Sequence, residues 1–355
     1  MGIIKLPQQS IEFFKYNLDE IFLSGNLAEG PWNKKLSQYI QELTGAKKAI
    51  TTNSNGAGIV ALLQLFNSLY GRDSVLLQSN TMYGVKTMIP AGNCKVAGFI
   101  DCKISTLMPG LEDVKNAIYE INDDQKKKLI VLLSHIGGII NPDIKDIAEL
   151  CTEENITLIE DCAHSFGATL YDQHSGLFGD AGVYSFYSTK AIPAGEGGVI
   201  VTKNEVLGDL AFNYSIYDRF KQEMKIGFNN RISEIQALFA YSVVSEWESI
   251  IQNKGEIAKK YISACEELKI SYISQNSNGH KGNYYKFVVY NPQKPILEQL
   301  YKLVTKTSPV YNYSIGVENP LATFHACLPI WYDQDPRVTD TVITELFMSI
   351  DGKLH

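Results

Sequence analysis

Residues 160–202 read EDCAHSFGATLYDQHSGLFGDAGVYSFYSTKAIPAGEGGVIVT. An acid, Asp161, ends a short apolar run, and a second β-like run at 182–187 leads to Lys190. A glycine-rich turn then precedes a third apolar run at 199–202. Strand, acid, strand, lysine and glycine turn in this order indicate one site built on the ends of strands.

The acid and the lysine suit the chemistry of pyridoxal phosphate. A lysine amine forms a Schiff base with the aldehyde of this cofactor, and a buried carboxylate keeps its pyridine nitrogen protonated so that the ring accepts electrons. The chain between Asp161 and Lys190 is long enough for a loop and one more strand. A lysine after a strand is more often a solvated surface residue, so the assignment depends on its neighbours.

The expected sheet extends on both sides of this stretch. It comprises seven β-like runs, most of them separated by a helix or a long connection: 49–52, 74–78, 95–100, 129–133, 157–161, 182–187 and 199–202. This alternation predicts an α/β fold with a mainly parallel sheet flanked by helices. Ligands bind at the carboxyl ends of such strands, where several candidates fall: Asn55, Tyr83, His135, Asp161 and Ser185.

The length of 355 residues allows one large domain and a smaller one. We expect a large α/β domain at 1–240, with an N-terminal helical arm, and a smaller α+β domain at 241–355. One long helix is expected to lead out of the large domain, and the smaller one is expected to contain a strand and two helices. These elements are predicted at 233–268, 284–289, 295–303 and the C-terminal end.

Composition narrows the class of protein. Hydrophobic residues make up 45% and charged residues 20% of the chain, as in ordinary globular proteins. The formal net charge of -7 argues against general nucleic-acid binding. No apolar run approaches the ~18 residues of a membrane-spanning helix, and the first residues lack the pattern of a signal peptide.

The six cysteines and six histidines do not predict a metal site. No Cys-x-x-Cys pair and no His-Glu-x-x-His motif occurs. Scattered cysteines without an export signal predict reduced thiols and a cytoplasmic location.

Several motifs together resemble the DegT/StrS family of sugar aminotransferases, which have the type I fold of pyridoxal-phosphate enzymes. The first block comprises EDCAH at 160–164, GDAGVYSF at 179–186, TK at 189–190 and GEGG at 195–198. The second block is the run GFNNRISEIQA at 227–237. With LPIW at 328–331, the resemblance covers nearly the whole chain.

The resemblance implies roles around the cofactor. Lys190 carries the cofactor and moves the proton, while Asp161 holds the pyridinium charge. His164 bonds the ring hydroxyl, and Ser185 and Asn229 hold the phosphate. Asn229 acts on the neighbouring subunit's cofactor in this family, which implies a homodimer with shared active sites.

A polar turn between a strand and a helix is a further candidate for the phosphate. Backbone N–H groups at Gly56 and Ala57, beside Asn55, form an anion site of the helix N-terminal type. The family usually has Gly-Thr here, so Ser54 or Asn55 is expected to replace the missing hydroxyl. For the residue that stacks on the cofactor ring we favour Tyr83, with Met82 as the alternative.

Substrate-binding candidates are His135, Arg219 and Arg231. The basic residues of the loop at 218–231 either meet a diphosphate or form a solvated face. Between 310 and 328 the chain is shorter than is usual in the family. In the family this region helps to shape the sugar pocket, so the identity of the sugar stays open.

The resemblance therefore implies transfer of an amino group, from glutamate, to a nucleotide-linked keto sugar for surface polysaccharide or other glycan synthesis. Pyridoxamine phosphate is the intermediate form of the cofactor. One rival is a dehydratase of the same fold, in which a histidine replaces the lysine, so Lys190 favours transamination. Another is a non-catalytic sensor of cofactor or sugar. A dinucleotide dehydrogenase is disfavoured because GEGG precedes a strand instead of opening a helix.

Overall fold

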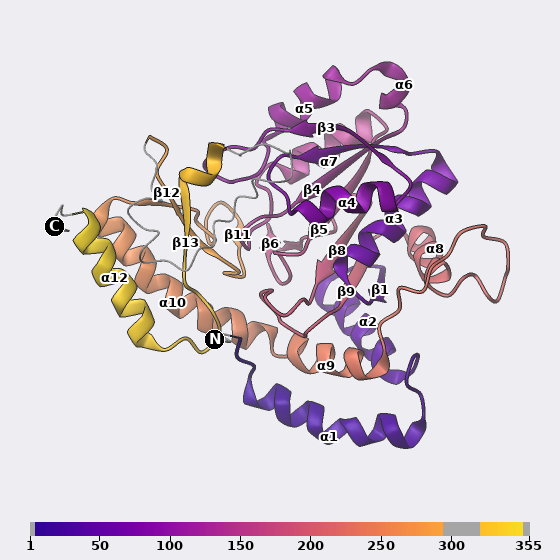
Figure 1. Cartoon of the computed structure of the whole chain (residues 1–355), viewed down its shortest axis with the longest axis horizontal. Helices are drawn as coiled ribbons and strands as arrows, with labels where there is room; N and C mark the ends of the chain where they lie inside the picture. The colour runs from indigo at the N-terminus through magenta and orange to yellow at the C-terminus, as the bar shows by residue number, and fades with distance from the viewer. Residues whose placement is uncertain (1–3, 294–319, 351–355) are drawn as a thin grey trace.

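The structure, a computed structural model, describes residues 4–293 and 320–350 (Figure 1). Its centre is a seven-stranded sheet in the order β1-β9-β8-β5-β4-β2-β3. In that order the strands span Lys48–Thr52, Gly198–Thr202, Ala181–Ser185, Thr157–Cys162, Leu129–Ser134, Ser74–Gln78 and Lys95–Ile100. Each strand coincides with one of the runs expected from the sequence, with small shifts at the ends.

The sheet is mainly parallel, as predicted. Strands β8, β5, β4, β2 and β3 pair in parallel, whereas β9 and β1 form an antiparallel edge. The carboxyl ends of the parallel strands therefore meet at one edge of the sheet, where α/β proteins bind ligands.

Helices cover both faces because the central strands are apolar on both. In β4, Ile130 and Leu132 pack into one core cluster and Val131 and Leu133 into another, as the twofold alternation of a strand requires. The first cluster includes side chains of three helices, α3 (Asn55–Tyr70), α4 (Tyr83–Ala91) and α8 (Glu205–Ser215). The second includes those of α5 (Leu111–Glu120) and α7 (Ile144–Glu153).

A third core cluster joins the N-terminal helices to the sheet. It contains residues of α1 (Gln8–Ser24), α2 (Pro31–Thr44) and α9 (Glu234–Val244). Helix α1 lies along the outside of the molecule and packs on α9 (Figure 1).

The single long helix expected at 233–268 is wrong. The chain forms α9 and then α10 (Trp247–Leu268), because Glu246 leaves the helical conformation with φ -100° and ψ 14°. Neither glycine nor proline marks this break, so the usual sequence signals of a helix end are missing. Helix α10 then links two cores: Ile250 packs in the third cluster and Ala258 in the C-terminal one.

The C-terminal part contains an antiparallel sheet of β10 (Ser271–Tyr272), β12 (Phe287–Tyr290) and β13 (His325–Leu328). This sheet packs against α10 and α12 (Pro336–Ile350). The expected strand and final helix are therefore present, while the helix expected at 295–303 lies outside the described residues. The domain boundary at 240/241 stays a prediction.

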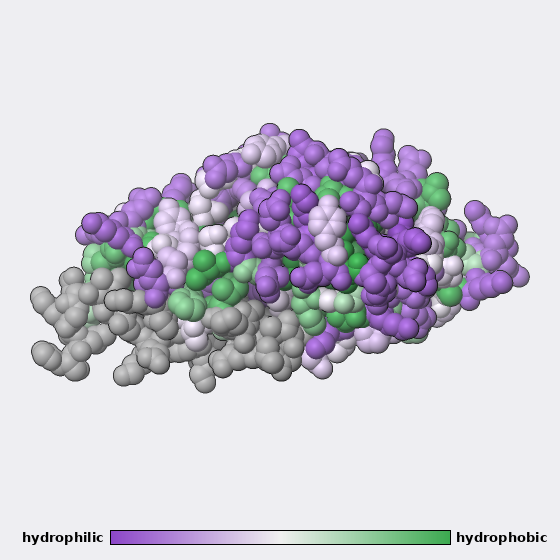
Figure 2. All heavy atoms as spheres, turned by 90° about the horizontal axis from the view of Figure 1, so that it is seen from above, coloured by the Kyte–Doolittle hydropathy of each residue, from purple (hydrophilic) through white to green (hydrophobic). Residues whose placement is uncertain are grey.

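Smaller elements complete the described parts. Strands β11 (His280–Lys281), β6 (Thr169–Leu170) and β7 (Gln173–His174) form a third sheet, and α6 (Asp123–Lys126) and a 3-10 turn (Pro320–Thr323) are short helices. From above, the surface is mainly hydrophilic with scattered hydrophobic patches (Figure 2). Across the described ranges, no helix combines the length and apolar character needed to cross a bilayer.

Two side chains of the ISEIQA motif hold distant segments together. Glu234 is buried, and its carboxylate accepts the N–H groups of Trp32 and Asn33 at 2.8 and 2.9 Å, which caps the start of α2. Gln236 donates from Nε2 to the carbonyl oxygens of Ala194 and Glu196. This motif therefore fixes the turn that follows Lys190, so its first role is structural.

Candidate active site

A cavity of about 410 Å³ opens at the carboxyl ends of β4, β5 and β8, beside the start of α3. Seven of the predicted site residues line it: Asn55, Gly56, His135, Asp161, His164, Ser185 and Lys190. Ten further residues complete the lining. Ser54 and Met82 had entered the sequence analysis as alternatives, and the other eight had not been singled out: Thr81, Val85, Met88, Ser134, Ile136, Ala163, Tyr187 and Glu196.

The carboxylate of Asp161 is held by three donors at the end of β5. Its Oδ1 accepts Asn55 Nδ2 and the Ala163 N–H, both at 3.1 Å, and its Oδ2 accepts the Ser134 hydroxyl at 3.0 Å. An ionised carboxylate offers about four acceptor positions, so one position remains on this buried group. Because Asp161 lines the cavity, that position suits an N–H donor of a bound molecule.

Lys190 lies on the turn after β8. Its N–H donates to the Tyr187 carbonyl at 2.8 Å, and its Nζ lies 5.4 Å from the centroid of the Tyr285 ring. No ion pair of Lys190 is found within residues 4–293 and 320–350. The Lys190 amine therefore makes no direct ion pair with a described carboxylate, although Asp161 and Glu196 line the same cavity.

The start of α3 forms an anion site next to this lysine. Ser54 is the N-cap and its Oγ accepts the Ala57 N–H at 3.1 Å, so this N–H is already engaged and the phosphate contact of Ala57 stays a prediction. The N–H groups of Asn55 and Gly56, in the first turn, have no acceptor within the helix. Both residues line the cavity, where the positive end of the helix favours an anion.

Gly198 brings the glycine turn against this helix start. A side chain at Gly198 would place its Cβ 2.6 Å from the backbone N of Asn55. Only glycine therefore allows β9 and α3 to approach this closely. Across the cavity, Ser185 Oγ accepts the Tyr187 N–H at 3.3 Å, which leaves its hydroxyl proton to donate to an anion.

His164 is buried against an aromatic ring that the sequence analysis missed. Its ring lies 4.4 Å from the ring of Tyr285, tilted by 34°. Burial lowers the pKa of His164 well below 6.5, and the charges of Lys190 and Lys286 lower it further. The neutral imidazole fits the predicted bond to a cofactor hydroxyl.

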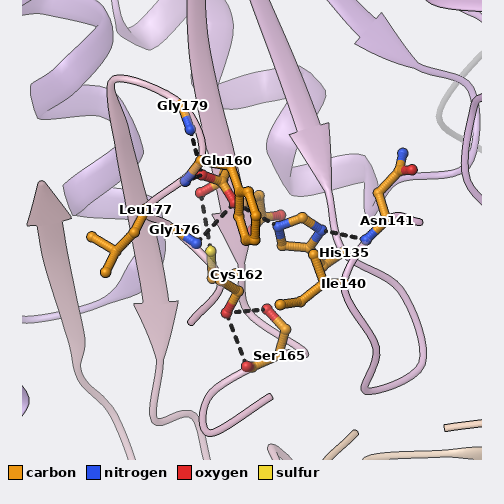
Figure 3. A network of polar contacts seen from close by, with 12 residues as sticks. His135, Ile140, Asn141, Glu160, Cys162, Ser165, Gly176, Leu177 and Gly179 are labelled. Atoms are coloured by element: carbon orange, nitrogen blue, oxygen red, sulfur yellow. Dashed lines mark hydrogen bonds and ion pairs between the residues drawn. The ribbon is translucent and has the colours of Figure 1, made fainter. Parts of the chain in front are cut away.

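His135 belongs to a buried network that holds the protein together (Figure 3). Its Nδ1 accepts the Asn141 N–H at 3.0 Å, so its Nε2 carries the proton and donates to Glu160 at 2.8 Å. Both ring nitrogens are thus used within the protein. His135 lines the cavity, and its predicted contact with substrate stays a prediction that the engaged ring nitrogens do not support.

Glu160 is the centre of that network. Its two oxygens also accept the N–H groups of Gly176, Phe178 and Gly179 at 2.7 to 2.8 Å. Four donors use the whole acceptor capacity of this fully buried carboxylate. Glu160 therefore fixes the loop before β8 to the end of β4.

One possible metal-ligand atom each of His135, Glu160 and Cys162 lies within 4.8 Å of the other two. The geometry does not favour a metal, because His135 directs a proton at Glu160 and Glu160 is saturated with donors. Burial, and then the charges of Glu160 and Asp161, raise the pKa of the Cys162 thiol well above 9.0. A metal would need the thiolate.

Three predicted residues lie apart from the cavity of their own chain. Arg219 and Arg231 both pair with Glu29, Arg219 at 2.5 Å, and Arg231 Nε donates to the Asn229 oxygen at 3.0 Å. Asn229 is exposed. Their contact with a cofactor or substrate therefore stays a prediction that requires a second chain.

The two candidates for the ring-stacking residue differ in their relation to the cavity. Met82 lines the cavity, whereas Tyr83 begins α4 beside it and is not part of the lining. Ala163, two residues after Asp161, also lines the cavity. The alternative residue, Met82, is thus the one in position to contact a ring held by Asp161.

Two polar side chains of the C-terminal part attach it to the site, and the sequence analysis missed both. Asn283 is fully buried and donates to the carbonyl oxygens of His164 and Phe166 at 2.8 and 2.9 Å. Gln275 donates to Gly137 at 3.2 Å, at the turn after β4. Neither residue lies at the end of a predicted strand of the large sheet, so no local signal pointed to them.

This geometry defines a class of protein: an acid at a strand end, a lysine before a glycine turn and an anion-binding helix start are the requirements of a pyridoxal-phosphate enzyme. The model of the DegT/DnrJ/EryC1/StrS aminotransferase family matches residues 8–319. The chain belongs to the DegT/DnrJ/EryC1/StrS aminotransferase family.

Individual relatives agree with this assignment. The chain is 29% identical over 244 residues to GDP-perosamine synthase of Vibrio cholerae, an alignment that covers 67% of this chain and 64% of that protein. The aligned part is therefore less than two thirds of that relative.

Solved structures show the fold. The aminotransferase TlmJ from Streptoalloteichus hindustanus superposes with a TM-score of 0.82 at 22% identity, over 100% of both chains. GDP-4-keto-6-deoxymannose-3-dehydratase (ColD) superposes with a TM-score of 0.81 at 16% identity, over 97% of this chain and 99% of that one. The predicted family, type I fold and pyridoxal-phosphate cofactor are confirmed. The fold alone does not separate aminotransferases from dehydratases.

Proposed function

We propose that this protein is a pyridoxal-phosphate-dependent aminotransferase that moves an amino group from an amino acid, glutamate, to a nucleotide-linked keto sugar. The observation that carries the proposal is the convergence of Lys190, Asp161 and the start of α3 on one cavity. Lys190 favours transamination over dehydration. The GDP-perosamine synthase relative supports a nucleotide-linked sugar, for a surface polysaccharide or another glycan.

The residues present fit the cofactor. The first-turn N–H groups of α3 and the hydroxyl of Ser185 suit its phosphate, and the open acceptor position of Asp161 suits its protonated ring nitrogen. Neutral His164 suits the ring hydroxyl. When bound through Lys190, pyridoxal phosphate supplies an electron-accepting ring that stabilises negative charge on the carbon that loses a proton.

Lys190 and Asp161 have different roles in the reaction. The Lys190 amine, once displaced by the amino donor, is the general base that removes the proton from the donor carbon and the general acid that returns it. Three donors orient the Asp161 carboxylate toward the cavity, where it can accept the N–H of the ring. Met82 and Ala163 line the cavity and offer apolar contacts to the ring.

We further propose that two copies of the chain share their active sites. Asn229 lies outside its own cavity and is exposed, which supports a contact with a second copy's cofactor phosphate. Arg219 and Arg231 lie on the same loop and suit the diphosphate of a sugar nucleotide bound there. The six free cysteines support a cytoplasmic location.

A visible absorption spectrum tests the central claim. The purified protein should show the yellow band of lysine-bound cofactor, and glutamate should convert it to the pyridoxamine form. Lys190→Ala should abolish turnover with a keto-sugar nucleotide while the variant still folds. Full turnover in Lys190→Ala, or no band after addition of cofactor, would refute the proposed activity.

Mixing two inactive variants tests the shared site. Equal amounts of Lys190→Ala and Asn229→Ala chains should recover about a quarter of wild-type activity, because half of the dimers then contain one complete site. A mixture no more active than its separate parts shows that the sites are not shared.

A further inference from the structure

Two ammonium groups share one aromatic ring at the edge of the active site. The Nζ atoms of Lys190 and Lys286 lie 5.4 and 5.0 Å from the centroid of Tyr285. The same ring packs on His164, which lines the cavity. Lys286 is thus a second cation close to the reacting lysine.

The backbone of Lys286 is fixed to the large sheet. Its N–H donates to the Gly137 carbonyl at 2.9 Å, and its carbonyl accepts Gln275 Nε2 at 2.7 Å. Asn283, three residues earlier, is anchored to the end of β5 through its bond to His164. Because these bonds use backbone atoms of Lys286, substituting its side chain leaves the attachment in place.

The lysines around this ring make no direct ion pair with a described residue. No ion pair of Lys190, Lys254 or Lys286 occurs within the described parts of the chain. Burial, and then the charge of Lys286, lower the pKa of Lys254 to about 7. Lys286 also lowers the pKa of His164 after burial and Lys190. An anion bound beside Lys286 would relieve this repulsion.

We propose that Lys286 is the anion-binding residue that receives a carboxylate of the amino donor. The inference rests on the proposed function. The donor nitrogen has to replace that of Lys190, and a donor α-carboxylate is one carbon away from its nitrogen. Lys286 is the described lysine that shares a ring with Lys190, since both Nζ atoms lie within 5.4 Å of the Tyr285 centroid. The diphosphate of a sugar nucleotide is separated from the aminated carbon by part of the sugar ring, and the loop with Arg219 suits it better.

The test compares Lys286→Gln with a matched control, Lys281→Gln. Lys281 is an exposed lysine of the neighbouring strand β11 and pairs with Asp172. Glutarate, a dicarboxylate with no amino group, is titrated into the holoenzyme by calorimetry, and the glutamate dependence of the spectral conversion is measured in parallel. Lys286→Gln should raise the dissociation constant of glutarate and the half-saturating glutamate concentration by about tenfold to a hundredfold. This is the effect expected for a lost charge-assisted hydrogen bond. Lys281→Gln should leave both unchanged.

The sugar side is tested with GDP, UDP and dTDP as diphosphate probes. Their binding should not change in Lys286→Gln. Weaker diphosphate binding with unchanged glutarate binding would overturn the donor assignment, and unchanged binding of both would overturn the anion site. Lys286→Arg should restore most of the glutarate affinity, and failure to do so would overturn a role based on charge.

Failure of the proposed function is distinguishable from failure of this inference. A wild-type protein that binds glutarate through Lys286 but does not convert with glutamate would refute the aminotransferase and keep the carboxylate site. A wild-type protein that converts with glutamate, with the same half-saturation in Lys286→Gln, would refute only the inference.

Discussion

The fully buried Glu160 offers the sharpest prediction about the scaffold. Glu160→Gln keeps the shape of the side chain but replaces one acceptor oxygen with an N–H₂ donor. Either orientation of the amide faces two donors. The NH₂ group meets the N–H groups of Phe178 and Gly179 at one position, and those of Gly176 and His135 at the other. The substitution therefore removes at least two hydrogen bonds.

The expected loss follows from this count. A hydrogen bond to a charged group contributes about 1.5–3 kcal/mol, so Glu160→Gln should lower the free energy of unfolding by about 3–6 kcal/mol. Glu234→Gln is the matched comparison, because Glu234 is also fully buried. Its Oε2 accepts only the Trp32 N–H, while Oε1 accepts both Asn33 groups, so one orientation loses a single bond. Glu234→Gln should lower the free energy of unfolding by about half as much as Glu160→Gln.

Urea denaturation followed by circular dichroism measures both variants. Cofactor is kept saturating in every sample, since a bound ligand raises apparent stability. Glu153→Gln, at an exposed position of α7, is the control and should match the wild type. A Glu160→Gln loss smaller than that of Glu234→Gln would refute the view that four donors saturate Glu160.

Two further predictions concern the affinity for the cofactor and the pH dependence of stability. Gly198→Ala should weaken cofactor binding about tenfold, because its Cβ meets backbone atoms at 2.6 Å. Fluorescence titration of cofactor checks this, with Gly255→Ala, whose nearest contact is 3.5 Å, as the neutral control. Burial lowers the pKa of His164, His174 and His325 below 6.5, so the unfolded chain binds more protons than the folded chain below that pH. The free energy of unfolding should therefore fall from pH 7 to pH 5, and a flat profile would contradict this.

The ends of the apolar runs gave the most reliable predictions from the sequence. An apolar run that ends in a polar residue has few alternatives once it is buried on both faces, and seven such runs predicted the sheet and the cavity. Asp161, Ser185 and Lys190 follow directly from that placement, because the carboxyl ends of parallel strands meet at one edge.

The sequence could not show hydrogen bonds that form only in the folded chain. The free donors of α3 depend on which N–H groups the Ser54 cap takes, and the role of His135 depends on Asn141 and Glu160. The hydrogen bonds of Asn283, in the C-terminal part, connect residues more than a hundred positions apart. No local pattern encodes a partner at that distance.

Adjacent acids in the EDCAH motif show how a motif combines structure with chemistry. Glu160 and Asp161 alternate across β5, so their side chains point to opposite faces of the sheet. Glu160 accepts four donors and is saturated, which makes it a structural residue. Asp161 accepts three and lines the cavity, so it alone can accept a proton-bearing nitrogen from a ligand. The number of donors around each carboxylate, more than its place in the motif, therefore distinguishes the group that acts from the group that supports.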